Sequence, residues 1–386
     1  MTTMITLDDI GKKYPGSARL AVQNLNLEVE KGETLVLLGP SGCGKTTTLE
    51  MINRLVTPTS GNIFINGRNT STLKTTELRR EIGYVIQDAG LFPHRTVAQN
   101  IATVPQLLKW QPERIEGRVD ELLEMAHLAP DEYRNRMPSE LSGGQRQRVG
   151  VARALAADPD VILMDEPFGA LDPITRGHQQ SEFLRLQDEI HKTIVFVTHD
   201  IDEALRMGDR IAVFGSDSTI EQLDTPMRLI TAPASPYVEN FVGGDTTMRV
   251  LGLMEVRADE QSPSSAEIEI VESGTPTNEI RIAGSEVRDV LVTDDRGRPQ
   301  RWVLADALDD LSGTVSHLPG SAPVEIEAGS SMREAAGALL SMPGENPRAV
   351  IVNEDGRATG ALTLADVQRA IAESSAPPSE QVGERE

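Results

Sequence analysis

Three short runs of apolar residues stand out in this sequence. They are Thr34–Leu38, Val161–Met164 and Thr193–Thr198. Continuous apolar runs of this length are typical of strands that are covered on both faces of a parallel sheet. Shorter strand-like segments in residues 1–30 and at Asn62–Asn66 predict an additional antiparallel portion. We therefore expect an α/β fold with a mixed sheet core.

A helical pattern dominates about residues 90–160, where we expect a helical subdomain inserted into the sheet domain. Gln145–Leu155 has apolar residues at helical spacing and contains no proline. Arg114–Met125 carries charged residues on one side and an apolar stripe on the other, as expected for a helix packed on a core. That stripe consists of Ile115, Val119, Leu122 and Leu123.

Proline, glycine and serine become dense between Thr225 and Gly244, which marks a domain boundary. A length of 386 residues suffices for two or three domains that each bury a core. We predict one domain at residues 1–244, a second at residues 245–373, and a disordered tail at residues 374–386.

The second domain contains an internal repeat. Arg288 leads through an acidic, glycine-containing turn to Asp306, and Arg348 leads in the same way to Asp366. Each copy is predicted to form a strand, a turn, a second strand and a helix, and Ser331–Leu340 supplies a helix before the second copy. The spacing from arginine to aspartate is the same in both copies, whereas the turn glycine is displaced by one place.

Composition narrows the class of protein. Hydrophobic residues make up 39%, and no apolar run approaches the about 18 residues that span a bilayer. The N-terminus has neither a basic start nor an apolar core, so it does not resemble a secretion signal. The single cysteine, Cys43, excludes an internal disulfide framework and fits a reducing compartment. We expect a soluble cytoplasmic protein.

The first candidate for chemistry follows the first apolar run. Gly39-Pro-Ser-Gly-Cys-Gly-Lys45-Thr46 fits the phosphate-loop pattern G-x-x-x-x-G-K-[ST], and Thr47–Ile52 continues as a helix. Free amide groups and the dipole at such a helix start favour an anion. Lys45 can reach the outer phosphates of a nucleotide, and the Thr46 hydroxyl can bind Mg²⁺. The segment therefore predicts a nucleotide site.

A second glycine-rich helix start lies about a hundred residues further along, at Leu141-Ser-Gly-Gly-Gln145. Ser142 can cap the helix that follows or bind an anion, so this segment is a second candidate phosphate site.

Together the two motifs resemble the ATP-binding-cassette (ABC) ATPases, and the resemblance covers about residues 4–243. It implies a phosphate-loop ABC cassette with a mixed sheet core, an antiparallel β subdomain and a helical subdomain. It also implies ATP hydrolysis with Mg²⁺. Further residues match the family in the order that it requires, namely Tyr14, Gln87, Asp165, Glu166, Asp172 and His199.

The resemblance gives each residue a role. Asp165 holds Mg²⁺ directly or through water, Glu166 is the general base, and His199 contacts the γ-phosphate. Gln87 reaches the metal and the attacking water, and it senses the membrane partner. The catalytic set is thus Glu166, His199 and Gln87, and the metal set is Thr46, Gln87 and Asp165. Tyr14 stacks on adenine and Asp172 crosses to the opposite subunit; the full nucleotide-binding set is Tyr14, Gly39, Pro40, Ser41, Gly42, Cys43, Gly44, Lys45, Thr46, Thr47, Ser142, Gly143, Gly144, Gln145 and Asp172.

Partners are also implied by the resemblance. In the family, the Ser142 motif completes the ATP site of a second copy, so that two ATP lie in a head-to-tail dimer. Phosphoryl transfer depends on positioning and charge stabilisation, so hydrolysis then requires dimer closure. A transporter can use that motion. The other implied partners are transmembrane permease subunits, whose coupling helix contacts the helical subdomain at the cytoplasmic face of the membrane, and indirectly an extracytoplasmic solute-binding protein.

The C-terminal repeat resembles a tandem of cystathionine-β-synthase-type (CBS) modules, with a degenerate first copy. The implied fold is an α+β pair with a regulatory role, through a bound nucleotide or through ionic strength. An unrelated α+β appendage is the alternative.

Local sequence within the cassette resembles importers of quaternary amines, the glycine betaine, choline and proline osmoprotectants. The resemblance rests on Lys45–Leu55, Pro58–Gly61, Gly83–Gln87 and Gly90–His94, while Asp88 departs from the usual glutamine. Sugar, polyamine or other solute importers are the near alternative, and their ATPases usually end in a β-barrel domain. ABC ATPases that act on ribosomes or DNA are a further alternative, but the net charge of −22 opposes nucleic-acid binding.

Overall fold

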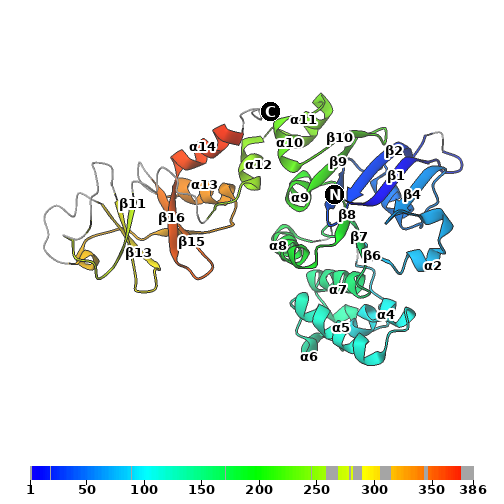
Figure 1. Cartoon of the computed structure of the whole chain (residues 1–386), viewed down its shortest axis with the longest axis horizontal. Helices are drawn as coiled ribbons and strands as arrows, with labels where there is room; N and C mark the ends of the chain where they lie inside the picture. Colours follow the sequence, from blue (N-terminus) through cyan, green and yellow to red (C-terminus); the bar gives the residue numbers. More distant parts are fainter. Residues whose placement is uncertain are drawn as a thin grey trace, which may run out of the picture. The chain divides into compact units, whose positions relative to one another are not determined.

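The computed structural model describes residues 2–17, 19–87, 89–169, 171–244, 246–257, 268–277, 280, 289–304, 314–342 and 347–374. The chain forms two compact units, Met1–Val242 and Gly243–Glu386 (Figure 1). This division lies two residues before the boundary predicted after Gly244. Among the described residues, no helix combines the length and apolar character needed to cross a bilayer.

An antiparallel sheet opens the first unit. Its strands are β1 (Thr3–Lys12), β2 (Val22–Glu30), β4 (Ser60–Ile65) and β5 (Arg68–Asn69), in the order β2-β1-β4-β5. Successive strand residues face opposite sides of a sheet, so one face of β2 is buried. That face carries Val22, Leu25, Leu27 and Val29.

The three apolar runs lie next to one another in a second, six-stranded sheet of order β10-β9-β3-β8-β7-β6. All residues of β3 (Thr34–Leu38) and β8 (Thr193–Thr198) are buried. The five strands from β9 to β6 are mutually parallel, and β10 is antiparallel to β9. Parallel strands end at one edge, so the loops after β3, β8, β7 and β6 meet there. The remaining strands are β6 (Ile82–Val85), β7 (Val161–Asp165), β9 (Arg210–Phe214) and β10 (Ile220–Asp224).

One apolar core joins the two sheets. It contains Leu7 of β1, Leu37 of β3, and Leu49 and Ile52 of helix α1 (Lys45–Ile52), all of them buried. The helix after the phosphate loop is therefore anchored to both sheets. Other helices of this unit are α2 (Thr75–Leu78), α8 (Pro173–Ile190), α9 (Ile201–Met207), α10 (Pro226–Thr231) and α11 (Pro236–Val242), with 3₁₀ turns at Thr70–Thr72 and Pro138–Glu140.

Five helices occupy the segment predicted as a helical subdomain. They are α3 (Val97–Ile101), α4 (Thr103–Leu107), α5 (Pro112–Met125), α6 (Pro130–Tyr133) and α7 (Gly143–Leu155). In α5 the predicted apolar stripe faces inward, with Val119, Leu122 and Leu123 buried and Ile115 half-buried. The amphipathic pattern of this helix was therefore interpreted correctly.

Two small sheets of identical topology make up most of the second unit. In each, the first pair of strands is parallel and the second pair is antiparallel. The first sheet contains β11 (Ile268–Glu272), β12 (Asp289–Thr293) and β13 (Pro299–Leu304), and the second contains β14 (Val324–Glu327), β15 (Arg348–Val352) and β16 (Ala358–Thr363). The helices are α12 (Thr246–Leu253), α13 (Met332–Leu340) and α14 (Leu364–Ser374), with a 3₁₀ turn at Val315–His317.

The register of the two copies corrects the predicted repeat by one residue. Gly297 and Gly356 occupy the same place, each in a turn with positive φ. The Asp294 carboxylate accepts hydrogen bonds from the amides two and four residues later, and the Asn353 side chain does the same. These turns fix the register, so Arg348 corresponds to Asp289 and not to Arg288. The glycine displacement predicted from the arginine match was therefore wrong.

The two copies also pack on each other. Leu291 and Trp302 of the first sheet share a buried cluster with Val350, Val352 and Ala361 of the second. Helix α13 begins as predicted, because the Ser331 hydroxyl and Glu334 side chain form a reciprocal capping box. Arg288, Asp306 and residues 375–386 of the predicted disordered tail lie outside the described residues, whereas Ser374, the first residue of that predicted tail, is the last residue of α14.

Candidate functional site

The phosphate loop wraps around its own lysine. It connects β3 to α1, and the Lys45 ammonium donates hydrogen bonds to the Gly39 and Pro40 carbonyls at 2.7 and 2.9 Å. Lys45 is buried, whereas the amides of Ser41 and Gly42 lie in the exposed part of the loop. The predicted residues from Gly39 to Gly44 thus form one compact turn, and Lys45, Thr46 and Thr47 are the first residues of α1.

Gly44 is required for this turn. It caps α1 with φ of 98°, and a Cβ at this position would lie 2.4 Å from the Ala21 carbonyl oxygen. Both the left-handed backbone and the close approach exclude a side chain. The neighbouring Cys43 is buried, and burial raises the pKa of its thiol. A protonated, enclosed thiol fits the role of a small filler and not that of a nucleophile.

Two carboxylates arrive at the loop from the end of β7. The Thr46 hydroxyl donates to the Asp165 carboxylate at 3.1 Å. Glu166, the next residue, has φ of 44° and is held by a hydrogen bond from its amide to the Val197 carbonyl on β8. A non-glycine residue in this backbone region is strained, and such strain is frequent at functional sites.

His199 completes this edge of the sheet. It follows β8, which lies between β3 and β7, and its Nδ1 is 3.1 Å from the Glu166 carboxylate. The side chains that follow three neighbouring parallel strands are therefore in contact, in two pairs, Thr46 with Asp165 and Glu166 with His199.

Gln87 reaches the same place from β6. A Cβ built on Gly169 would lie 3.4 Å from the Gln87 amide nitrogen and 3.6 Å from a Glu166 carboxylate oxygen. Gln87 and Glu166 thus border the same small space, which a side chain at Gly169 would fill. Asp88, which departs from the family pattern, lies outside the described residues.

The carboxylates make this edge of the sheet electrostatically unfavourable without a cation. Burial, together with the charge of Glu166, raises the pKa of Asp165. Burial and the charge of Asp165 likewise raise the pKa of Glu50 on α1. A hydroxyl and a carboxylate oxygen 3.1 Å apart are the hard ligands that Mg²⁺ prefers when a nucleotide supplies the rest. The residues present therefore fit a nucleotide-bound magnesium ion.

The second motif lies elsewhere in this unit. Ser142 caps α7, with its hydroxyl accepting from the Gln145 amide while the Gln145 side chain accepts from the Ser142 amide. The Gln145 side chain also donates through Nε2 to the Tyr133 hydroxyl at 3.0 Å. Within the described residues, no hydrogen bond or ion pair joins residues 141–145 to residues 39–46. The two predicted phosphate sites are thus separate within one chain.

The remaining predicted residues divide between these two places. Asp172 caps α8, accepting from the Thr175 amide at 3.1 Å, and belongs with the second motif. Tyr14 lies in the loop after β1, where its ring is partly exposed and the Lys12 ammonium lies 5.1 Å from its centre. An accessible aromatic face can stack on a base.

Sequence reasoning missed the polar contacts that hold the second motif in place. Arg148, which lies one turn beyond Gln145 on α7, pairs with Glu182 of α8. These two residues are 34 positions apart in the chain. No local pattern in the sequence marks such a pair.

Comparisons with known proteins give the chain its relatives. Residues 22–169 match the ABC transporter family. The chain is 42% identical over 372 residues to the choline transport ATP-binding protein OpuBA of Bacillus subtilis, covering 94% of this chain and 95% of the relative. It is 43% identical to the osmoprotectant import ATP-binding protein OsmV of Salmonella typhimurium, covering 93% and 94%. Among solved structures, a dimeric ATP-binding cassette bound to ADP and Pi is 37% identical with a TM-score of 0.52, covering 58% of this chain and 99% of that one.

Proposed function

This chain belongs to the ABC transporter ATP-binding proteins, and from that premise we propose that it powers import of a quaternary-amine osmoprotectant through a separate permease. Membership of the family confirms the predicted ABC cassette fold and the predicted ATP hydrolysis coupled to transport. The solute class is suggested by the choline and osmoprotectant transport proteins that match almost the whole chain.

The observation that supports this proposal most strongly is the pair of contacts at the sheet edge. Thr46 meets Asp165, and Glu166 meets His199, beside a loop that ends in Lys45. Metal binding, base catalysis and phosphate binding require these groups within a few ångströms of one another. We assign the outer phosphates of ATP to Lys45 and the exposed loop amides, since a bound anion can replace the carbonyls that now hold the ammonium.

We assign Mg²⁺ to Thr46 and Asp165, with Gln87 at the border of the site. When bound, the ion supplies neutralisation of charge on the β- and γ-phosphates. Glu166 accepts a proton from the attacking water, and its strained backbone and its contact with His199 orient the carboxylate. His199 can then contact the γ-phosphate from the same edge. Proper positioning and a base together account for large accelerations of phosphoryl transfer.

The second motif acts on a partner copy in this proposal. Ser142, Gly143 and Gly144 present a helix start that has no contact with the phosphate loop of its own chain among the described residues. In a head-to-tail dimer each such start completes the ATP site of the other chain, with Asp172 beside it. Hydrolysis then depends on closure of two chains, and reopening returns the permease to its other state.

A groove of about 320 Å³ supports docking of a permease. It runs between β6 and the helical subdomain, and exposed Phe92 lies in its wall. Asn100 is buried and fixes the loop that carries Phe92 by hydrogen bonds to Phe92, Arg95 and Thr96. The walls combine cationic and apolar side chains, which suits a helix that has polar ends. The residues of the walls include Arg79, Arg80, Tyr84, Thr103, Val104 and Arg153. We place the permease coupling helix here, at the cytoplasmic face of the membrane.

The C-terminal unit bears on the alternatives. Sugar and polyamine importers were expected to carry a β-barrel at this end. The described second unit instead has two three-stranded sheets, with α12, α13 and α14 packed in one apolar cluster. We propose that this unit is a CBS-like regulatory pair, because both copies share one strand register and pack face to face.

A reconstituted transporter tests the solute. Tagged protein is purified with native membranes, its permease and solute-binding protein are identified, and uptake of labelled glycine betaine, choline, maltose and spermidine is measured in proteoliposomes. We expect ATP-dependent uptake of glycine betaine or choline only, abolished by Lys45→Ala, which removes the ammonium from the loop. Uptake of maltose or spermidine would transfer the chain to the alternative importers, and absence of any permease would contradict a transport role.

A further inference from the structure

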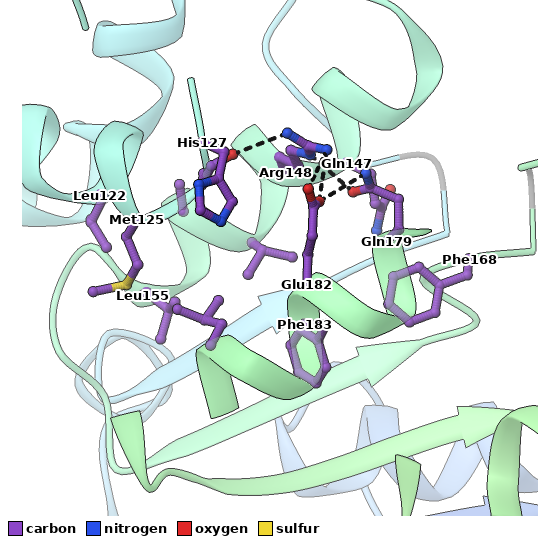
Figure 2. A pocket seen from close by; sticks show the side chains of 14 residues that line it. Leu122, Met125, His127, Gln147, Arg148, Leu155, Phe168, Gln179, Glu182 and Phe183 are labelled. Atoms are coloured by element: carbon purple, nitrogen blue, oxygen red, sulfur yellow. Dashed lines mark hydrogen bonds and ion pairs between the residues drawn. The ribbon is translucent and has the colours of Figure 1, made fainter. Parts of the chain in front are cut away.

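Arg148 joins three helices at one point. Its Nη2 pairs with the Glu182 carboxylate at 2.7 Å, its Nε donates to the Gln179 side-chain oxygen at 3.3 Å, and its Nη1 donates to the Ala126 carbonyl at 3.4 Å (Figure 2). Gln179 in turn donates to Glu182 at 3.1 Å. The Arg148 guanidinium of α7 thus contacts two side chains of α8 and the backbone at the end of α5. We call Arg148, Gln179, Glu182 and the Ala126 carbonyl the Arg148 clamp.

A small pocket lies beside the clamp. It has a volume of about 40 Å³ and lies between α5, α7 and α8, and the side chains that line it are drawn in Figure 2. Buried Gln147 lines it, and its amide nitrogen has no hydrogen-bond partner among the described residues. Most of the apolar side chains that line it are themselves buried. The clamp therefore adds polar contacts to the apolar packing of α7 on α8. The apolar lining is Leu122, Met125, Leu155, Phe168 and Phe183.

The second motif approaches α8 at Gly144, and we call α7, the helix that begins at this motif, the signature helix. A Cβ on Gly144 would lie 3.3 Å from the Thr175 methyl and 3.7 Å from the Gln179 amide nitrogen. Thr175 is the residue whose amide is capped by Asp172. A shift of α7 along α8 would consequently move Ser142 and Gly144 relative to Asp172, the group with which they are proposed to face the partner copy.

Helix α8 is itself anchored on the chain's own ATP site. The Arg176 guanidinium pairs with Asp200 at 3.4 Å, and Gln180 donates to buried Glu203 at 3.0 Å. Asp200 follows His199 directly in the chain. Helix α8 is therefore fixed to the loop that carries His199. The Arg148 clamp in turn holds the signature helix, α7, on α8.

We propose that Arg148 is a positioning residue whose effect falls on the ATP held by the partner copy. It does not touch the phosphate loop of its own chain. Through the clamp it sets where Ser142–Gly144 present their helix start, and a displacement of about 1 Å in such a site can cost about 100-fold in rate. The inference rests on the proposed head-to-tail dimer.

Mixed dimers of two differently tagged chains test this placement. Lys45→Ala is put in the first chain, so that only the phosphate loop of the second chain can trap ADP with vanadate. Arg148→Ala is then put in either chain. In the second chain, Arg148→Ala affects only the site whose phosphate loop carries Lys45→Ala and is already inactive. Trapping should therefore equal that of Lys45→Ala alone. In the first chain it should lower trapping by about tenfold, because its signature helix completes the only intact site.

Ser142→Arg separates failure of the inference from failure of the dimer. In the same two placements it should give the same pattern, since Ser142 lies in the motif itself. If it does not, the composite dimer is wrong. If it does, but the Arg148→Ala defect follows its own phosphate loop or is equal in both placements, Arg148 is merely structural and the inference is overturned.

Two further variants guard against a folding defect. Glu182→Gln and Arg148→Lys weaken the clamp without a large truncation, and each should show the same placement with a smaller loss. Arg210→Ala is the matched control, since Arg210 has similar side-chain exposure, 31% against 23%, and pairs with Glu33 at 3.1 Å, so that it contacts neither α7 nor α8 in that pair. Its effect should be equal in both placements, and placement-dependent loss with Arg210→Ala would contradict the clamp.

Discussion

The two units of this chain use their strands in opposite ways. The cassette brings residues from three strand ends to one edge, so that Lys45, Asp165, Glu166 and His199 gather there. In the described part of the second unit, polar side chains such as Asp294 and Asn353 close turns, and the two copies bury an apolar interface between them. The parallel strands of the cassette bring reactive side chains together at one edge of the sheet. The repeat of the second unit instead uses its strands to bury an apolar interface between its two copies.

Backbone strain follows the same division. Every described non-glycine residue with positive φ lies in the cassette, Glu166 among them. In the described second unit, positive φ is confined to glycines such as Gly297 and Gly356. Strain persists only where surrounding contacts enforce it, and the hydrogen bond from Glu166 to β8 is such a contact. The cassette therefore keeps a strained backbone at Glu166, a residue of its proposed catalytic set.

A single methyl group at Gly44 should have a large effect on nucleotide binding. Gly44→Ala forces a Cβ within 2.4 Å of the Ala21 carbonyl at φ of 98°, so the loop must shift. We expect nucleotide affinity to fall by about 100-fold, as for other displaced sites. Gly67→Ala is the control, with φ of 71° and open space around it. It should cost about 1 kcal/mol in stability and leave nucleotide binding intact. Equal binding by both variants, measured with a fluorescent ATP analogue, would rule out this account of the loop.

A second change separates chemistry from stability within the cassette. Burial raises the pKa of Asp165, so the folded state binds its proton more tightly than the unfolded state does. The free energy of unfolding therefore falls as pH rises from about 4 through the folded pKa. Asp165→Asn removes that loss, and in the absence of nucleotide it should raise the melting temperature at pH 7 by about 2–4 °C while hydrolysis is lost.

The pH series checks the sign of this effect. The stabilisation by Asp165→Asn should shrink as pH falls and vanish below about pH 4, where the carboxyl is protonated in both states. A variant that is less stable than the parent at pH 7, without nucleotide, would mean that the carboxylate is not under electrostatic strain.

Removal of the second unit tests whether the division is functional. From Asp245 to Glu386 the chain has 12 Arg, no Lys and 26 acidic residues, hence a charge of 12 − 26 = −14. Self-repulsion at such density is screened over about 8–10 Å at physiological salt. A reconstituted transporter without residues 245–386 should keep basal ATPase activity but lose part of its response to KCl or to an adenine nucleotide. Identical response curves would reduce the unit to a structural or dimerising element.

The smallest effects test the register of the repeat. Gly297→Ala and Gly356→Ala each place a Cβ at positive φ without a close clash, so each should cost about 1 kcal/mol. Gly337→Ala is the control, because Gly337 lies inside α13 with no atom near its Cβ, and it should stabilise by about 1 kcal/mol. Chemical denaturation monitored in the second unit gives all three values. A cost at only one turn would show that the two glycines are not equivalent.

The sequence predicted the central elements because full burial leaves a continuous apolar run, as in β3 and β8. The phosphate loop was predictable because its glycines and lysine are contiguous. The Arg148 clamp was not, since its side-chain partners Gln179 and Glu182 lie more than thirty positions away along the chain, on α8. The repeat was found but misaligned, because matching arginines carry less constraint than the side-chain hydrogen bonds that close each turn.

Glu166→Gln tests the central claim most directly. The amide keeps the size of the side chain but cannot accept the proton of the attacking water. With Mg²⁺ and ATP, we predict hydrolysis lower by about 10²–10⁴-fold with ATP binding retained, and a stable ATP-bound dimer in sedimentation velocity. Near-normal turnover, or a chain that stays monomeric with ATP bound, would contradict a composite ATPase with Glu166 as its base.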